Sequence, residues 1–402
     1  MARVPFWHIP ALACQVLGKL AQWGHMRAGC LYRLVAGVVG AVFGWGLTIG
    51  MAAEVTRSVP VIYCTDLFHP HDDPDDHFDL ATLYAMPELD IKGVVLDQGR
   101  KQLERPGRIP VSQMNKITGR NVPAVIGLGD PLKSPDDKAL DQPAQFQGAV
   151  DLIVQTLRAS ARPVCIATTG SVRDVVCAFN REPSLFRKKV AMVLAYIGEA
   201  SDTKFQEYNV GLDPQAFVGL MRSGLRVYWV PCFDGGLWQN RGHASFFRAS
   251  QRPLLEGAIP ELNQYFIYAL EKETAEPLAF LTRPVEPERQ ARLFAGTRNL
   301  WCAAVLGVMS GREVVFDGSK WISELPQRGR AAKVAGRKPL FGFSEVQVSV
   351  SDAGVVSYGK RPGSHKVKRF QVRDSAQYEQ GMVEATAALL SSLGRTGDRG
   401  TR

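Results

Sequence analysis

The densest chemistry in this sequence of 402 residues lies in segment 64–80, CTDLFHPHDDPDDHFDL, which holds six aspartates and three histidines. Carboxylates gathered in one loop need a compensating cation or take up protons. Several converging oxygens are the ligands of Ca²⁺ or Mg²⁺, whereas histidines also suit Zn²⁺ or Fe²⁺. The residue types alone also fit a solvated acidic loop in which one aspartate caps the helix expected from Asp76.

Short β-rich runs alternate with stretches of helical periodicity from Pro60 to Pro231. Continuous apolar strands between helices predict an α/β fold that is Rossmann-like, with a mostly parallel open sheet and helices on both faces. Ligands of such sheets bind beyond the carboxyl ends of the strands, where the acidic loop begins. The expected strands are Val61–Cys64, Ile91–Leu96, Val122–Gly127, Pro163–Ala167, Val190–Ile197 and Leu225–Pro231, and the expected helices are Asp76–Tyr84, Gln147–Ala159, Ser171–Phe179 and Pro214–Met221.

The C-terminal part of the chain adds further helices and a hairpin that turns through Asp352-Ala353-Gly354. The basic run Lys366–Arg373 alternates with apolar residues, which favours a strand with one solvated face over a nucleic-acid patch. Segment 327–339 is expected to be a mobile loop. The expected helices are Glu261–Glu271, Asn299–Met309 and Ala376–Ser391, and the hairpin strands are Val346–Val350 and Val355–Tyr358.

The formal net charge of +9 belongs to the two ends of the chain. Residues 1–53 carry +4 and residues 326–402 carry +8, which leaves −3 for the segment between them. A mildly acidic body argues against nucleic acid as a partner and favours a small-molecule substrate. Assembly into a homo-oligomer is left open.

Residues 34–53 form an uncharged apolar run that follows Arg27 and Arg33. A basic region, an apolar core and small residues before Glu54 predict a signal peptide, with Met26 as an alternative start, and export to the periplasm or the exterior. An uncleaved membrane anchor is the alternative, because about twenty apolar residues can span a bilayer. After cleavage no stable insertion in a membrane is expected. The predicted division is a signal peptide at 1–53, one folded domain at 54–395 and a disordered tail at 396–402.

Five of the seven cysteines would remain after cleavage: Cys64, Cys165, Cys177, Cys232 and Cys302. An odd number without a CxxC pair gives neither a disulfide framework nor a zinc site. We expect most of these thiols to be small buried apolar groups, with one disulfide left open.

Five segments in order resemble the inosine–uridine-preferring nucleoside hydrolase family, over roughly residues 60–392. The family's first strand runs into DxDxGxDD and a helix, and here Asp75-Asp76 precede Pro87-Glu88 by the family's ten-residue gap. Ala167–Ser171, ATTGS, resembles the family's ATGPLTN, and Glu207–Pro214, EYNVGLDP, resembles its EFNxxxDPEA. A helix and strand ending at Pro231, and a closing hairpin and helix, complete the resemblance.

The resemblance implies the nucleoside hydrolase fold and hydrolysis of the N-glycosidic bond of a ribonucleoside or related glycosyl compound by a metal-bound water. Such reactions pass through an oxocarbenium-like transition state, and Ca²⁺ with a carboxylate would deprotonate the water. Carried over by position, the resemblance implies catalytic roles for Asp66, Glu207 and Asn209, sugar binding by Asp75, Glu207 and Asn209, and Ca²⁺ ligation by Asp66, Asp76 and the Thr169 carbonyl.

The sequence departs from the family at several of these positions. Five extra residues and no glycine lie between Asp66 and Asp75, and Cys64 stands at the family's first aspartate. The family opens a late helix with a His-Asp pair that supplies the leaving-group acid and the last metal carboxylate. We align Arg298 and Asn299 with that pair. Asn299 can still offer Ca²⁺ an oxygen, and Arg298 can bind an anionic substrate group but cannot give up a proton.

Three functions therefore stay open. The retained carboxylates favour an N-glycosyl hydrolase that uses Ca²⁺ on a nucleoside or other glycosyl substrate. Loss of the proton donor would instead leave a non-catalytic protein that binds metal and sugar. The added histidines allow a metal-dependent enzyme of different chemistry that uses Zn²⁺ or Fe²⁺.

Overall fold

The computed structural model describes residues 58–201, 205–326 and 338–394. Its main sheet contains β1 (Val59–Thr65), β2 (Leu89–Leu96), β3 (Ala124–Ile126), β4 (Val164–Thr168), β5 (Val190–Tyr196), β6 (Val227–Val230), β11 (Phe341–Val350), β12 (Val356–Tyr358) and β13 (His365–Val372). The order is β12-β11-β13-β6-β5-β4-β1-β2-β3. Neighbours from β13 to β3 pair in parallel, and β11 is antiparallel to β12 and β13. The predicted mostly parallel, open sheet is confirmed.

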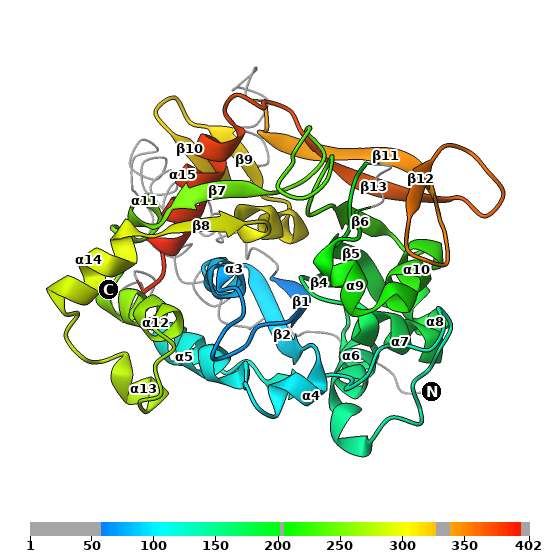
Figure 1. The fold of residues 1–402 in the computed structure, drawn as a ribbon, viewed down its shortest axis with the longest axis horizontal. Helices are drawn as coiled ribbons and strands as arrows, with labels where there is room; N and C mark the ends of the chain where they lie inside the picture. The colour runs from blue at the N-terminus through cyan, green and yellow to red at the C-terminus, as the bar shows by residue number, and fades with distance from the viewer. Residues whose placement is uncertain (1–57, 202–204, 327–337, 395–402) are drawn as a thin grey trace, which may run out of the picture. The chain divides into compact units, whose positions relative to one another are not determined.

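Helices cover both faces of this sheet (Figure 1). Successive side chains of a strand point to opposite faces, so Val61 and Tyr63 of β1 pack in one apolar cluster, and Ile62 and Cys64 pack in the other. The first cluster includes α3 (Asp75–Tyr84), α5 (Arg108–Thr118), α12 (Pro260–Leu270) and α15 (Tyr378–Leu390), and the second includes α6 (Gly148–Ala159), α7 (Arg173–Arg181), α8 (Pro183–Lys189) and α10 (Pro214–Arg222).

Smaller elements connect these layers. Two antiparallel pairs lie outside the main sheet: β7 (Phe247–Ser250) with β8 (Thr297–Leu300), and β9 (Glu313–Phe316) with β10 (Trp321–Glu324). The short helices are α4 (Gly99–Gln102), η1 (Ala144–Phe146), α9 (Tyr208–Leu212), α11 (Gln251–Leu255), α13 (Pro277–Phe280), α14 (Pro287–Ala295) and η2 (Ala303–Ser310).

One predicted helix is wrong over its first residues. The apolar run Asn299–Met309 was expected to be helical throughout, but its start belongs to β8 and Asn299 pairs with Arg248 of β7. The helical part is η2, which begins only at Ala303. Pairing with β7, a partner about fifty residues earlier in the chain, overrides the local helical pattern. The other expected strands and helices are present, with ends shifted by a few residues.

Several sequence predictions fall on residues outside the described ranges. These are the signal peptide, nearly all of the loop 327–339, and the tail. In the part of the chain that is described, no helix is both long and apolar enough to cross a bilayer. The five cysteines of this part are buried free thiols, so none of them forms the disulfide that the sequence left open.

Candidate active site

Polar side chains at the carboxyl ends of β1, β4 and β5 meet around a cavity of about 480 Å³. Six of the eight predicted site residues line it: Asp66, Asp75, Asp76, Thr169, Glu207 and Asn209. The other lining residues are Phe68, Asp72, Asp73, Tyr196, Phe205, Tyr208, Cys232, Phe233, Leu237, Trp238, Trp301 and Cys302.

The acidic loop brings five carboxylates to this cavity, and three of them, Asp66, Asp75 and Asp76, are predicted site residues. Asp76, in the first turn of α3, accepts hydrogen bonds from the hydroxyls of Thr65 at 2.7 Å and Thr169 at 3.2 Å. Burial, followed by the charge of Asp79, raises the pKa of Asp76 to about 7. Burial and the charge of Asp76 also raise the pKa values of Asp66 and Asp75 well above the ordinary range. Such a group of acids favours uptake of a cation or of protons.

Glu207 and Asn209 hold the ends of neighbouring strands together. Glu207 caps α9 and accepts hydrogen bonds from the backbone N–H groups of Asn209, Val210 and Gly198 at 2.9, 3.2 and 2.8 Å. The Asn209 amide donates to the Thr169 and Tyr196 carbonyls, each at 3.2 Å. The Asn209 oxygen is therefore the atom that can face a ligand. The Glu207 carboxylate is engaged by the backbone and by the Cys232 thiol, so its main role is to position this loop.

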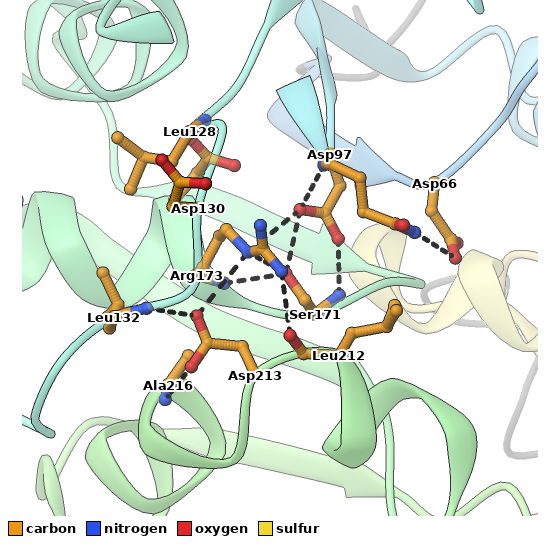
Figure 2. A network of polar contacts seen from close by, with 12 residues as sticks. Asp66, Asp97, Leu128, Asp130, Leu132, Ser171, Arg173, Leu212, Asp213 and Ala216 are labelled. Carbon is orange, nitrogen blue, oxygen red and sulfur yellow. Dashed lines mark hydrogen bonds and ion pairs between the residues drawn. The ribbon is translucent and has the colours of Figure 1, made fainter. Parts of the chain in front are cut away.

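A buried ionic network supports the loop that carries Thr169 (Figure 2). Asp97, just beyond β2, accepts from the Ser171 N–H at 2.7 Å and from its hydroxyl at 2.8 Å. Arg173 lies between two carboxylates, 3.6 Å from Asp97 and 3.5 Å from Asp213. Gly170 is required here, because a Cβ at this position would lie 2.7 Å from an Asp97 oxygen. Gln98 links the network to the cavity by donating to Asp66 at 3.3 Å.

Asp174, close to this network, provides a stability test. Its carboxylate accepts from the Leu128 N–H at 2.9 Å, and burial, followed by the charge of Asp97, raises its pKa to about 7. In an unfolded chain the pKa is about 3.9. The protonated acid therefore stabilises the fold fully below about pH 4, and this contribution is lost as the pH rises through about 7.

We expect Asp174→Asn to remove this pH dependence while keeping the hydrogen-bond acceptor. Relative to the parent, its free energy of unfolding should rise by roughly 1–3 kcal/mol from about pH 5 to about pH 8, measured by urea denaturation. Asp90→Asn, which changes an exposed carboxylate beside Lys92, is the matched control. A constant difference between Asp174→Asn and the parent across this range would contradict the prediction.

The rest of the acidic loop is held by side chains outside the cavity. Asp72 pairs with Lys101 and with Arg105, and Asp73 lies 3.8 Å from Arg298. The three histidines of the loop are absent from the described lining of the cavity. His69 stacks on Tyr268 at 4.6 Å and bonds to the Glu273 carbonyl. The lining thus gives no support to a zinc or iron site built from the histidine insertion.

The alignment of Arg298 and Asn299 with the family's late pair does not match the local structure. Both residues belong to β8 and are absent from the described lining, because pairing with β7 holds this segment in a strand. The two residues that precede η2 and line the cavity are Trp301 and Cys302. The Trp301 indole donates to the Cys232 carbonyl at 3.0 Å, and the Cys302 thiol bonds to Asp79.

An aromatic group on one side of the cavity is the main feature that the sequence analysis missed. Phe233, Trp238, Phe246 and Trp301 pack with ring centroids 5.5–6.1 Å apart, and all but Phe246 line the cavity. We call these four residues the aromatic wall. The only signal in the sequence was the position of Phe233 and Trp238 soon after a predicted strand, and the contact with Trp301 depends on tertiary packing.

The donor set fits a hard cation. Asp66, Asp76 and the Thr169 carbonyl supply oxygens only, which is the chemistry that Ca²⁺ prefers, with water and substrate hydroxyls to complete the shell. Among the described residues, no group of three or more His, Cys, Asp or Glu side chains has a geometry that could hold a metal. The set proposed for Ca²⁺ contains only two such side chains, Asp66 and Asp76, and a backbone carbonyl. It therefore falls below that size of group, and the absence of a larger group among the described residues does not conflict with it.

The segment that carries most of the cavity residues is similar in sequence to known proteins. Residues 65–251 match the sequence model described as inosine-uridine preferring nucleoside hydrolase. The pyrimidine-specific ribonucleoside hydrolase RihA of Escherichia coli O139:H28 is 28% identical over 188 residues, which cover 42% of this chain and 59% of RihA. RihA of Citrobacter koseri is 30% identical over 189 residues, with the same shares covered.

A solved plant nucleoside hydrolase, PpNRh1, superposes with a TM-score of 0.50 and 14% identity, over 82% of this chain and 98% of that chain. At that identity the likeness shows the fold. The matched sequence spans 59% of the length of the curated relatives and includes the acidic loop, Thr169, Glu207 and Asn209. Residues 65–251 of this chain are therefore similar in sequence to the inosine-uridine preferring nucleoside hydrolase family.

Proposed function

We propose that this protein hydrolyses the N-glycosidic bond of a ribonucleoside or related glycosyl compound. The observation that carries the proposal is the meeting of Asp66, Asp75, Asp76, Thr169 and Asn209 around one cavity at the carboxyl ends of the strands. Carboxylates and amide oxygens suit a sugar diol and a hard cation, and the lining provides no Lys, Arg or His among the described residues.

Asp66, Asp76 and the Thr169 carbonyl would hold Ca²⁺. When bound, that ion would lower the pKa of water and polarise the sugar hydroxyls. Asp66 takes the proton from the attacking water, because its carboxylate borders the cavity and the Gln98 amide that donates to it lies at a long 3.3 Å. Asp75 and the Asn209 oxygen bind sugar hydroxyls, and Glu207 positions Asn209.

A chelator experiment with Asp76→Ala tests the proposal. Reducing-sugar release from a nucleoside panel should require Ca²⁺, and both chelator and Asp76→Ala should lower it by at least about 100-fold. Calorimetric titration with Ca²⁺ should show binding to the parent and a loss of binding in the variant. Release that is insensitive to chelator would refute the metal's role, and absence of release on every substrate would refute hydrolysis.

A protein that binds metal and sugar without catalysis is the second candidate. The observation that favours it is Trp301-Cys302 before η2, where neither side chain is an evident proton donor. Ca²⁺ binding without release from any glycoside would support it. Export through residues 34–53 and self-association stay predictions.

A further inference from the structure

Among the described residues, the lining beyond the carboxylates carries no evident acid for a departing base. The Trp301 indole N–H is already bonded to the Cys232 carbonyl at 3.0 Å, and indole is not an acid at neutral pH. The Cys302 thiol is buried and bonded to Asp79. Burial raises the pKa of the Tyr208 phenol at the cavity rim to about 12, which makes it a poor general acid.

The aromatic wall offers ring faces at the same place. Trp238 is 48% exposed and adopts a φ of 62°, in the left-handed region that is costly for a bulky residue. Its ring lies 5.5 Å from Phe233 and 6.1 Å from Trp301. Indole faces attract cations, and an exposed tryptophan held in an unfavourable conformation at a cavity indicates a role toward a ligand.

The charge of the cavity also favours a cation. Asp72 is paired with Lys101 and Arg105, and Asp73 lies near Arg298, so both rim acids have basic partners. Asp66, Asp75 and Asp76 have no Lys, Arg or His beside them in the described lining. Glu207 is a fourth carboxylate of the lining without a basic partner there, and one divalent ion would balance only two of these charges. A ligand with a positive charge would reduce the excess negative charge that remains.

From these observations, and resting on the proposed hydrolase function, we propose that the substrate is an N-ribosyl compound with a cationic leaving group, of the N-ribosylpyridinium class. The C1′–N bond breaks with both electrons going to the ring nitrogen, so the pyridine leaves neutral and needs no proton. The water oxygen forms the new bond to C1′, and Asp66 takes the water's proton. A neutral purine or pyrimidine would leave as an anion unless an acid protonated it.

The first test compares leaving groups on the full chain with Ca²⁺. N-ribosylnicotinamide should be hydrolysed with a kcat/KM at least about 100-fold above those of inosine and uridine, since general acid catalysis contributes about 10²–10⁴-fold to rates. Trp301→His, which introduces an imidazole before η2, should raise the rate on inosine and so lower this ratio of kcat/KM values at least about tenfold. Trp301→Phe, which keeps an aromatic ring without an acid, should leave the ratio above tenfold.

The second test measures binding without turnover. Quenching of tryptophan fluorescence should show that N-methylnicotinamide, a cation, binds at least about tenfold more tightly than neutral nicotinamide, because Trp238 and Trp301 line the cavity. Trp238→Leu should remove most of that difference. If N-methylnicotinamide and nicotinamide bound the parent protein with equal affinity, the proposal of a cationic leaving group would be wrong.

The two proposals can fail separately. Efficient hydrolysis of inosine or uridine, equal to that of N-ribosylnicotinamide, would overturn the leaving-group inference and leave the hydrolase function intact. Selective binding of N-methylnicotinamide without hydrolysis of any substrate would overturn the hydrolase function and support the cation site of the aromatic wall.

Discussion

Asp66→Asn is expected to lower kcat for sugar release by about 10²–10⁴-fold, the range that a general base contributes. Asparagine keeps the size of the side chain and an oxygen that can accept from Gln98, so the loop should stay in place. It loses the ability to take a proton from water. The measurement is steady-state release of ribose under saturating substrate and Ca²⁺, with the melting temperature as a check of folding.

Asp90→Asn provides the control for this substitution. It makes the same chemical change at an exposed residue of β2 that pairs with Lys92, outside the cavity lining. Its kcat should equal that of the parent. If Asp66→Asn kept kcat within about threefold of the parent while remaining folded, another group would have to be the base.

Arg173→Ala is expected to destabilise the fold by about 3–5 kcal/mol. The guanidinium is buried between Asp97 and Asp213, at 3.6 and 3.5 Å, and also donates to the Leu212 carbonyl at 2.9 Å (Figure 2). Its removal leaves two buried carboxylates without a countercharge. Urea denaturation at neutral pH measures the loss, and Arg100→Ala, which breaks an exposed pair with Asp130, should change stability little.

A second substitution separates charge from packing at this position. Asp213→Asn removes one of the two carboxylates and keeps a side chain that can accept from the Leu132 and Ala216 N–H groups. In the Arg173→Ala background it should restore part of the lost stability. If Arg173→Ala lowered the free energy of unfolding by less than about 1 kcal/mol, the network would not be a major source of stability.

Local patterns predicted the parallel strands and most helices because apolar runs and helical periods depend on neighbouring residues. The resemblance to the nucleoside hydrolase family singled out Asp66, Asp75, Asp76 and Thr169, which follow predicted strands or lie at the start of a predicted helix. Parallel strands place their carboxyl ends at one edge of the sheet, so these residues meet there. The same resemblance named Glu207 and Asn209, which also line the cavity, but the backbone hydrogen bonds that occupy Glu207 were not visible in the sequence.

Arg298 and Asn299 lie outside the described lining of the cavity for a physical reason. The helix-like apolar run lies in η2 itself, whereas the residues before it pair with β7, and Asn299 lies opposite Arg248. The spacing of apolar residues within one segment does not show which distant segment it will pair with. The cavity therefore receives Trp301 and Cys302 in place of the expected pair.

The sequence by itself determined the α/β order of the chain and the acidic, oxygen-rich side of the cavity, because both follow from residue patterns within single segments. Only the tertiary structure decided which aromatic side chains share the cavity with those acids. The aromatic wall joins Phe233, Trp238 and Phe246 to Trp301, more than fifty residues later in the chain, and the contact exists only because β7 and β8 pair. Side-chain contacts across such distances are set by packing and strand register.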